Sequence, residues 1–114
     1  MNYSETRPWG LFTNLYDQSH TKVKSLEVKP HQKLSLQSHE KRSEHWMVVK
    51  GTATIHLDGK KFDLHPGEHV FIPVTSKHRL ENATDEMIEV IEVQTGSYFG
   101  EDDIIRYEDD YNRR

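Results

Sequence analysis

The sequence predicts an all-β domain, either a sandwich or a barrel. Short runs of alternating apolar and polar residues fill the middle of the chain, as expected for half-buried strands. Turn signals such as Asp58-Gly59 and Pro66-Gly67 separate these runs, at the spacing typical of sandwiches and barrels. The hydrophobic content of 33% also fits, because each barrel strand sends only alternate residues inward.

Each expected strand has a start or a stop signal. Pro30 ends the first strand, since proline cannot donate to a β-ladder, and Pro73 ends a later one. Gly51 breaks the strong apolar run that follows Glu44. The expected strands are residues 22–28, 33–39, 44–49, 52–57, 60–64, 69–72, 78–82 and 87–94.

The length of 114 residues is that of one domain. We expect residues 21–96 to form the barrel, residues 1–20 an N-terminal arm, and residues 97–114 an acidic C-terminal segment. The arm carries Trp9, Phe12 and Tyr16 and is expected to pack against the outside of the barrel. Residues 101–110 fit either one or two helical turns or a strap over the barrel.

Composition excludes several classes of function. The net charge of −4 argues against a nucleic-acid partner, which needs clustered basic charge. There is no apolar run near the roughly 18 residues needed to cross a membrane. The polar N-terminus has no apolar signal core, so we expect a cytoplasmic protein. Because there are no cysteines and eight histidines, any metal site must use histidine, carboxylate or amide ligands.

One constellation of side chains points to a metal site. Gln37 and His39 are two residues apart and face the same way on a strand, and Glu44 begins the next strand. His78 opens a later strand, four residues before Asn82. Two strand pairs that each aim ligands inward can surround one cation. The alternative is that the two histidines are ordinary hydrogen-bonded barrel residues.

This spacing resembles the two cupin motifs, G-x5-H-x-H-x4-E-x6-G and G-x5-P-x4-H-x3-N. Gln37 stands where the first motif usually has a histidine, and its opening glycine is replaced near His31. The resemblance implies a cupin double-stranded β-helix, a jelly-roll barrel. It also implies one divalent ion, Zn²⁺, Mn²⁺, Co²⁺ or Ni²⁺, in the barrel mouth. The implied ligands are Gln37, His39, Glu44 and His78.

A longer resemblance covers nearly the whole chain. The strings are R-P-W-G (7–10), L-S-L-Q-x-H-x-x-R-x-E-H-W-x-V-V-x-G (34–51), I-P-x4-H-R-L-x-N (72–82) and I-E-V-Q-x-G-x-Y-x-G-E-D-D-I-x-R (91–106). Together they resemble the C-terminal domain of type II mannose-6-phosphate isomerases, usually fused behind a mannose-1-phosphate guanylyltransferase. Gln37 is among the matching residues.

The resemblance implies metal-dependent interconversion of mannose 6-phosphate and fructose 6-phosphate, feeding GDP-mannose and polysaccharide synthesis. A proton must then move between C1 and C2. Glu92 is the first candidate for the base, because its strand face is partly apolar and would raise its pKa. Its alternative role is an ion pair with Lys24. Arg42, in the turn between two ligands, is expected to reach the substrate, or else to pair with Glu40 or Glu44.

The phosphate needs basic contacts, and Lys24, Arg79 and Arg106 are the substrate-binding candidates, with Lys33 as a further one. Each alone is more often a solvated charge. The alternative function is a non-catalytic metal-cupin module that binds a sugar phosphate or sugar nucleotide beside a separate guanylyltransferase. An oxygenase is disfavoured, since glutamine is an unusual ligand for oxygen-activating iron.

A homodimer is also expected. The apolar side chains of Leu34, Leu36 and Val49 are predicted to lie on the outer face of the barrel. Apolar residues on such a face need cover, which a second subunit or the N-terminal arm could supply.

Overall fold

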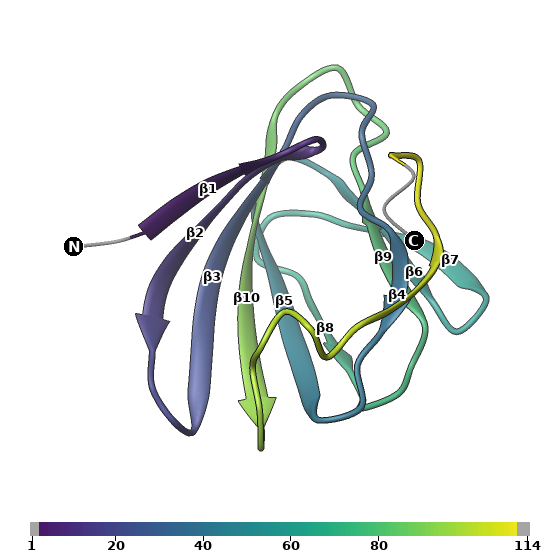
Figure 1. The fold of residues 1–114 in the computed structure, drawn as a ribbon. Coiled ribbons are helices and arrows are strands. Elements are labelled where there is room, and N and C mark those ends of the chain that lie inside the picture. The colour runs from purple at the N-terminus through teal and green to yellow at the C-terminus, as the bar shows by residue number, and fades with distance from the viewer. Residues whose placement is uncertain (1–2, 112–114) are drawn as a thin grey trace.

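A computed structural model describes residues 3–111, which fold into two antiparallel sheets (Figure 1). The first sheet has the order β1 (Tyr3–Arg7), β2 (Gly10–Asp17), β3 (Thr21–Val28), β10 (Ile88–Gly96), β5 (Arg42–Lys50) and β8 (His69–Ile72). The second has the order β11 (Ile105–Glu108), β4 (Leu36–Ser38), β9 (His78–Glu81), β6 (Ala53–Leu57) and β7 (Lys60–Leu64). Residues 3–111 include no helix, and so none that is long and apolar enough to cross a membrane.

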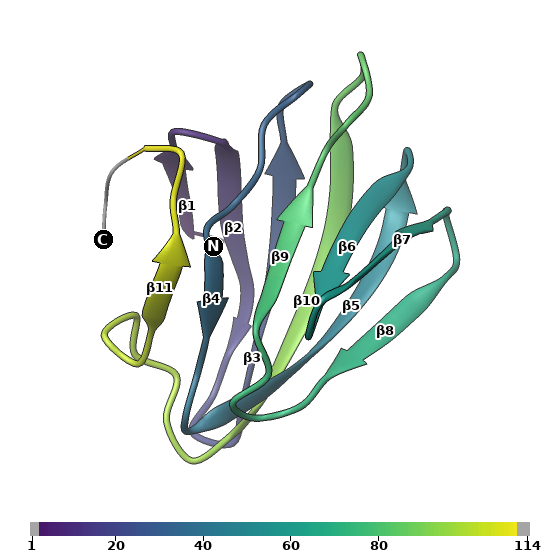
Figure 2. The ribbon, with the colours of Figure 1, turned by 90° about the vertical axis from the view of Figure 1, so that its right-hand side faces the viewer.

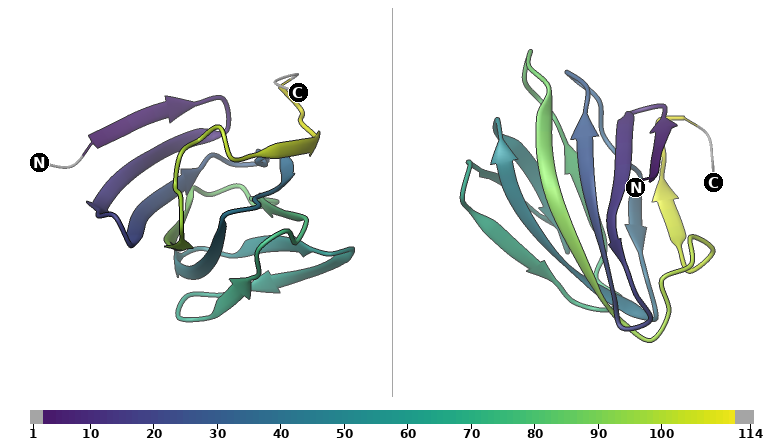
Figure 3. Two further views of the ribbon diagram at one scale, coloured as in Figure 1. Left: turned by 60° about the horizontal axis from the view of Figure 1, so that its bottom comes forward. Right: turned by 90° about the vertical axis from the view of Figure 1, so that its left-hand side faces the viewer.

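The two sheets face each other as the walls of an open barrel (Figures 2 and 3). β3 and β5 to β10 lie where the alternating pattern predicts them, within two residues at each end. The apolar core fills the space between the walls. Its buried residues are Trp9, Phe12, Leu26, Val28, Trp46, Val48, Ala53, Ile55, Ile72, Leu80, Ile88 and Val90.

β10 and β5 divide the interior into an apolar part and a polar part. Along the inward face of β10, the buried residues change from Val90 to Glu92 and Gln94. β5 runs antiparallel beside it, with Val90 opposite Val48 and Gln94 opposite Glu44. Because the register is fixed, apolar side chains of both strands meet at one end and polar ones at the other. The polar end is where the functional site lies.

The N-terminal segment is not an arm on the outside of the barrel, as the sequence suggested. It forms the hairpin β1–β2, and β2 extends the first sheet by pairing with β3. Trp9 and Phe12 are buried in the core, with exposed fractions of 5% and 6%, whereas Tyr16 is 49% exposed. The hairpin covers an edge of β3 that would otherwise leave backbone groups unpaired.

The C-terminal segment follows the strap alternative and not the helical one. After β10 the chain crosses from the first sheet to the second, where β11 pairs with β4 (Figures 1 and 3). Its last described turn is held by Tyr111, whose hydroxyl donates to the Gln32 side chain. The expected strand 33–39 is shorter than predicted, because only residues 36–38 pair as β4.

Two apolar residues that were predicted to face outward, Val49 and Leu34, differ in their position in the structure. Val49 is 43% exposed on β5, as expected for an outer face. Leu34 instead packs against the core, which contradicts its predicted outward position. The reason is local: Leu34 precedes the regular part of β4, so the two-residue alternation does not set its direction.

Asn82, the last residue of the second motif, has a structural role. Its side chain is fully buried, and Nδ2 donates to the carbonyl oxygens of Val28 at 2.9 Å and Glu86 at 2.6 Å. Its Oδ1 accepts from the backbone amide of Thr84 at 2.9 Å. These bonds fix the turn before β10, and they use both N–H donors and the acceptor oxygen of the asparagine amide.

Replacing Asn82 should therefore destabilise the fold. We expect Asn82→Ala to lower the free energy of unfolding by about 2–4 kcal/mol, because several buried polar groups lose their partner. Urea denaturation measures this change. Asn14→Ala is the matched control, with an expected change within about 0.5 kcal/mol, since the Asn14 Oδ1 accepts no hydrogen bond from the described residues. Equal losses in the two variants would contradict the assignment.

Candidate metal centre

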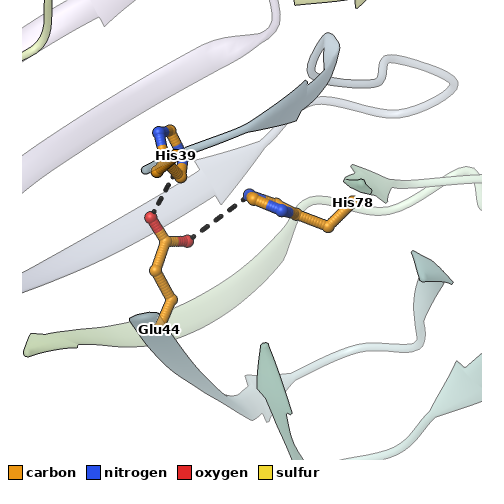
Figure 4. A group of neighbouring side chains, drawn as sticks. All are labelled: His39, Glu44 and His78. Carbon is orange, nitrogen blue, oxygen red and sulfur yellow. Dashed lines mark ion pairs between the residues drawn. The ribbon is translucent and has the colours of Figure 1, made fainter. Parts of the chain in front are cut away.

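Three side chains from separate parts of the barrel converge at its polar end. His39 follows β4, Glu44 lies on β5 and His78 opens β9. Their ligand atoms lie within 4.8 Å of one another, and their exposed fractions are only 1–2%. The Glu44 carboxylate lies between the two imidazoles (Figure 4), with Oε2 3.3 Å from His39 Nε2 and Oε1 3.8 Å from His78 Nε2.

Both imidazoles are oriented by backbone carbonyls. His39 Nδ1 donates to the carbonyl oxygen of Asp103 at 2.7 Å, and His78 Nδ1 donates to that of Ser76 at 2.9 Å. A carbonyl can only accept, so each Nδ1 carries a proton, and each Nε2 is the ring nitrogen that faces Glu44. His78 Nε2 is buried and makes no hydrogen bond to the described residues. Metal-binding histidines are held in this way.

The charge states of these residues also suit a cation. Burial lowers the pKa of His39, which favours the neutral imidazole that binds metals. Burial alone would raise the pKa of Glu44, but His78, Arg42 and His39 outweigh it and hold that pKa well below its usual range. Two imidazoles and a carboxylate are a typical ligand set for a borderline divalent ion. The residues present therefore fit the metal that the motif implies.

Gln37 lies beside this group. It stands opposite His78 where β4 pairs with β9. Its Oε1 accepts a hydrogen bond from the Ser35 hydroxyl at 2.8 Å, and its side chain lines the adjoining pocket. As a fourth ligand, Gln37 is a proposal.

An open pocket adjoins the centre, on the side where Gln37, Arg42 and Glu92 lie. The wall combines apolar side chains, four basic residues and two carboxylates. Its charged residues are Arg7, Lys24, Arg42, Glu92, Glu101 and Arg106. Because Arg42 also contacts the centre, this guanidinium joins the pocket to His39, Glu44 and His78, the candidate metal-binding group.

Arg42 is a buried residue, 4% exposed, and not part of a surface ion pair. Its Nε donates to Glu44 Oε2 at 2.9 Å, and its Nη2 lies 3.3 Å from His39 Nε2. Its Nη1 is buried and makes no hydrogen bond to the described residues. A buried cationic donor without a partner, on a pocket wall, is suited to an anionic or carbonyl oxygen of a ligand.

Glu92 is 6% exposed and points to the same polar end. Burial, together with the nearby Glu44 carboxylate, raises the pKa of Glu92 well above its usual range. Gln94 Nε2 donates to Glu92 Oε1. Lys24 stands opposite Glu92 in the strand register but forms its ion pair with Glu101. The structure thus leaves the Glu92 carboxyl group on the pocket wall.

The phosphate candidates divide between the two faces of the barrel wall. Lys24 and Arg106 line the pocket. Arg79 does not, because the residue after His78 on β9 points to the opposite face. Its Nε donates to the Leu34 carbonyl oxygen at 2.7 Å, and its Nη1 lies 3.5 Å from a Glu108 carboxylate oxygen. Arg79 therefore contacts the C-terminal segment and does not line this pocket.

Lys33 also lies away from the pocket. Its Nζ is 3.9 Å from an Asp110 carboxylate oxygen. Like Arg79, it therefore interacts with the C-terminal segment and not with the pocket.

Three residues at the site were not among the sequence-based candidates. Arg7 and Glu101 line the pocket, and Asp103 supports His39. The Asp103 carboxylate also accepts from the backbone amides of Glu40 and Lys41, both at 3.0 Å. All three lie in strings that carry the family resemblance, R-P-W-G and G-E-D-D. Their place in these strings was the one feature of the sequence that could have indicated their role.

The centre predicts specific metal binding. We expect the protein to bind one divalent ion and His78→Ala to weaken it by at least about 100-fold, because a ligand is removed. Elemental analysis identifies the metal, and competition with a chromophoric chelator measures the affinity. His20→Ala, in the exposed β2–β3 turn, should bind like the wild type. Unchanged affinity in His78→Ala would place the metal elsewhere.

Comparison with solved structures identifies the fold. CapF, a capsular polysaccharide assembling protein from Staphylococcus aureus, matches with a TM-score of 0.80 and 22% identity, over 95% of this chain and 32% of that one. The Cnp3 cupin domain of Schizosaccharomyces pombe matches with a TM-score of 0.72 and 9% identity, over 75% of this chain and 64% of that one. At these identities the likeness shows the fold alone, a cupin double-stranded β-helix.

Sequence relatives are longer proteins. Alginate biosynthesis protein AlgA of Pseudomonas aeruginosa is 49% identical over 94% of this chain and 22% of its own length. A mannose-1-phosphate guanylyltransferase of Sinorhizobium fredii is 44% identical over 91% of this chain and 20% of its own length. Xanthan biosynthesis protein XanB of Xanthomonas campestris is 45% identical, over 94% and 23%. The chain thus spans about a fifth of the length of these relatives.

The family model described as mannose-6-phosphate isomerase C-terminal matches residues 1–109, nearly the whole chain. The match includes the metal-binding group and the pocket-lining residues described above. The chain therefore belongs to the mannose-6-phosphate isomerase C-terminal family, with a cupin fold.

Proposed function

We propose that this chain interconverts mannose 6-phosphate and fructose 6-phosphate, with a divalent ion held by Gln37, His39, Glu44 and His78. One observation carries the proposal: the Glu92 carboxyl group and the partnerless Arg42 Nη1 share a basic pocket beside the metal-binding group. Membership of the isomerase family supports the same reaction. The bound ion would supply Lewis-acid polarisation of the substrate carbonyl.

Glu92 is suited to move the proton. As a carboxylate, it would take the C2 proton of the open-chain aldose, leaving an enediolate with a double bond between C1 and C2 and its negative charge on the C1 oxygen. The hydroxyl proton on the C2 oxygen would pass to the C1 oxygen, and the carboxylic acid would return its proton to C1 as C2 becomes the carbonyl carbon. The reaction needs no other reactant. Burial raises the pKa of Glu92 toward the working pH, where a base of this kind is most effective.

Arg42 would stabilise the charge that this proton transfer creates. Negative charge grows on the substrate oxygens as the proton leaves carbon. The Arg42 guanidinium is already fixed by its hydrogen bond to Glu44, so its free Nη1 is oriented before the reaction begins. A preorganised donor in a buried site stabilises developing charge more effectively than water does.

The relatives suggest the biological setting. AlgA and XanB are named for the biosynthesis of alginate and xanthan, and other relatives are named mannose-1-phosphate guanylyltransferases. We propose that the isomerase reaction feeds mannose toward GDP-mannose and polysaccharide synthesis. A non-catalytic module that binds a sugar phosphate or sugar nucleotide is the second candidate. It is favoured by the guanylyltransferase name of relatives of which this chain matches only about a fifth.

Metal removal tests the reaction itself. We expect isomerisation of mannose 6-phosphate to stop in excess chelator and to return when the metal is restored. The formation of fructose 6-phosphate measures the rate. His78→Ala should be inactive, because it removes a ligand, while His20→Ala keeps the wild-type rate. Binding of metal and mannose 6-phosphate without turnover would instead favour the binding module.

A variant of the base tests the role of Glu92. We expect Glu92→Gln to lower kcat by about 10²–10⁴-fold with little change in KM, because the amide cannot accept the proton. Incorporation of deuterium from solvent into the sugar phosphate should fall in parallel. Glu89→Gln is the matched control on β10, where Glu89 accepts from the Ser25 hydroxyl. Wild-type exchange in Glu92→Gln would assign the base to another residue.

A further inference from the structure

The pocket has a cationic end built by the N-terminal hairpin and β3. Lys24 is 5% exposed, and its Nζ lies 4.5 Å from the centre of the Phe12 ring. Arg7 approaches the same ring, with Cζ at 4.9 Å. Arg106 lines this pocket from β11. Lys24 is buried beside this ring, where few water molecules can screen its charge, whereas Arg7 is 29% exposed and forms an ion pair with Glu5.

Glu101 supplies the counter-charge of Lys24 at this end. It forms an ion pair with Lys24, yet its own side chain is 54% exposed, against 6% for Lys24. The pair is therefore asymmetric. The ammonium is fixed inside the pocket, whereas the carboxylate reaches in from the surface segment that links β10 to β11. If the pair separates, the Glu101 carboxylate returns to water at little cost in free energy. The buried Lys24 ammonium then needs another anion to compensate its charge.

We propose that Glu101 is an internal counter-ion that the phosphate group of a sugar phosphate replaces at Lys24, with Arg7 and Arg106 as further contacts. The inference rests on the proposed function and names the phosphate subsite and its selectivity. A phosphate monoester carries about −1.5 to −2 charges and three acceptor oxygens, so it satisfies this cluster better than one carboxylate. A neutral sugar offers no charge and cannot displace Glu101.

The subsite would also orient the substrate. Lys24 and Arg106 line the same pocket as Arg42 and Glu92. A phosphate held at Lys24 therefore leaves the other end of the sugar chain free to reach Arg42 and the metal-binding group. Binding energy from the remote phosphate would thus position the reacting carbons.

A purely structural ion pair leads to different expectations. If Glu101 served only to hold the surface segment against β3, removing its charge would loosen the segment and weaken ligand binding. If Glu101 is a competitor of the phosphate, removing its charge strengthens phosphate binding. The direction of the change in affinity therefore separates the two roles.

Calorimetric titration with inorganic phosphate, mannose 6-phosphate and mannose tests the inference, on the protein as purified and after chelation. The chelated sample excludes phosphate bound at the metal. We expect Glu101→Gln to bind both phosphates about three- to tenfold more tightly, because the competing charge is gone. Binding of mannose should not change. Equal or weaker phosphate binding in Glu101→Gln would overturn the proposal.

Two further variants complete the design. Asp102→Asn removes the same charge from the neighbouring residue, whose carboxylate accepts from the Tyr98 hydroxyl, and it should bind phosphate like the wild type. Lys24→Met should weaken phosphate binding at least about tenfold, because the buried cation is lost. Thermal unfolding identifies any variant that fails to fold, and Glu101→Gln, at an exposed position, still decides the question.

The result is independent of turnover. Tighter phosphate binding in Glu101→Gln, without isomerisation by any variant, would support the subsite and contradict the proposed isomerase. Wild-type isomerisation with an unchanged KM for mannose 6-phosphate in both Glu101→Gln and Lys24→Met would support the isomerase and overturn the subsite.

Discussion

The buried negative charge of Glu44 is the constraint around which the polar end of the barrel is arranged. A carboxylate that is 1% exposed must be compensated by cations or by hydrogen-bond donors. Arg42 Nε and Trp46 Nε1 donate to its two oxygens, at 2.9 and 3.0 Å. The Nε2 atoms of His39 and His78 face the same carboxylate, at 3.3 and 3.8 Å. A divalent ion between these three groups is the natural complement of that charge.

The arrangement depends on strand register. Glu44 stands opposite Gln94 on β10, two positions along the inward face from Glu92. A shift of one residue would turn these side chains outward and bring apolar ones into their place. The apolar end of the same strands, with Val90 opposite Val48, resists such a shift because it would expose the core. The hydrophobic core therefore fixes the geometry of the polar site, even though the core side chains take no part in the proposed reaction.

Local patterns predicted most of the barrel and the three grouped ligands. Alternation and turn residues fix where a strand lies, and a ligand pair such as Gln37 and His39 follows from the two-residue period. What failed depends on long-range contacts. The hairpin at Trp9 is stabilised by pairing with β3, and the Lys24 partner proved to be Glu101, 77 positions away. Arg79 lies on the other face of β9, as the strand period after His78 indicates, and its contacts with the C-terminal segment again depend on long-range packing.

The segment after β10 connects the two halves of the site. Asp103 holds His39 through its carbonyl oxygen and the following turn through its carboxylate, while Glu101, two residues earlier, pairs with Lys24 in the pocket. One short piece of chain therefore supports His39, a candidate metal ligand, and also occupies the cationic end of the pocket. If a phosphate displaces Glu101, the segment moves at a position two residues from Asp103, whose carbonyl oxygen orients His39. Substrate binding and the geometry of the metal centre are then mechanically linked, although the segment contributes no ligand of its own.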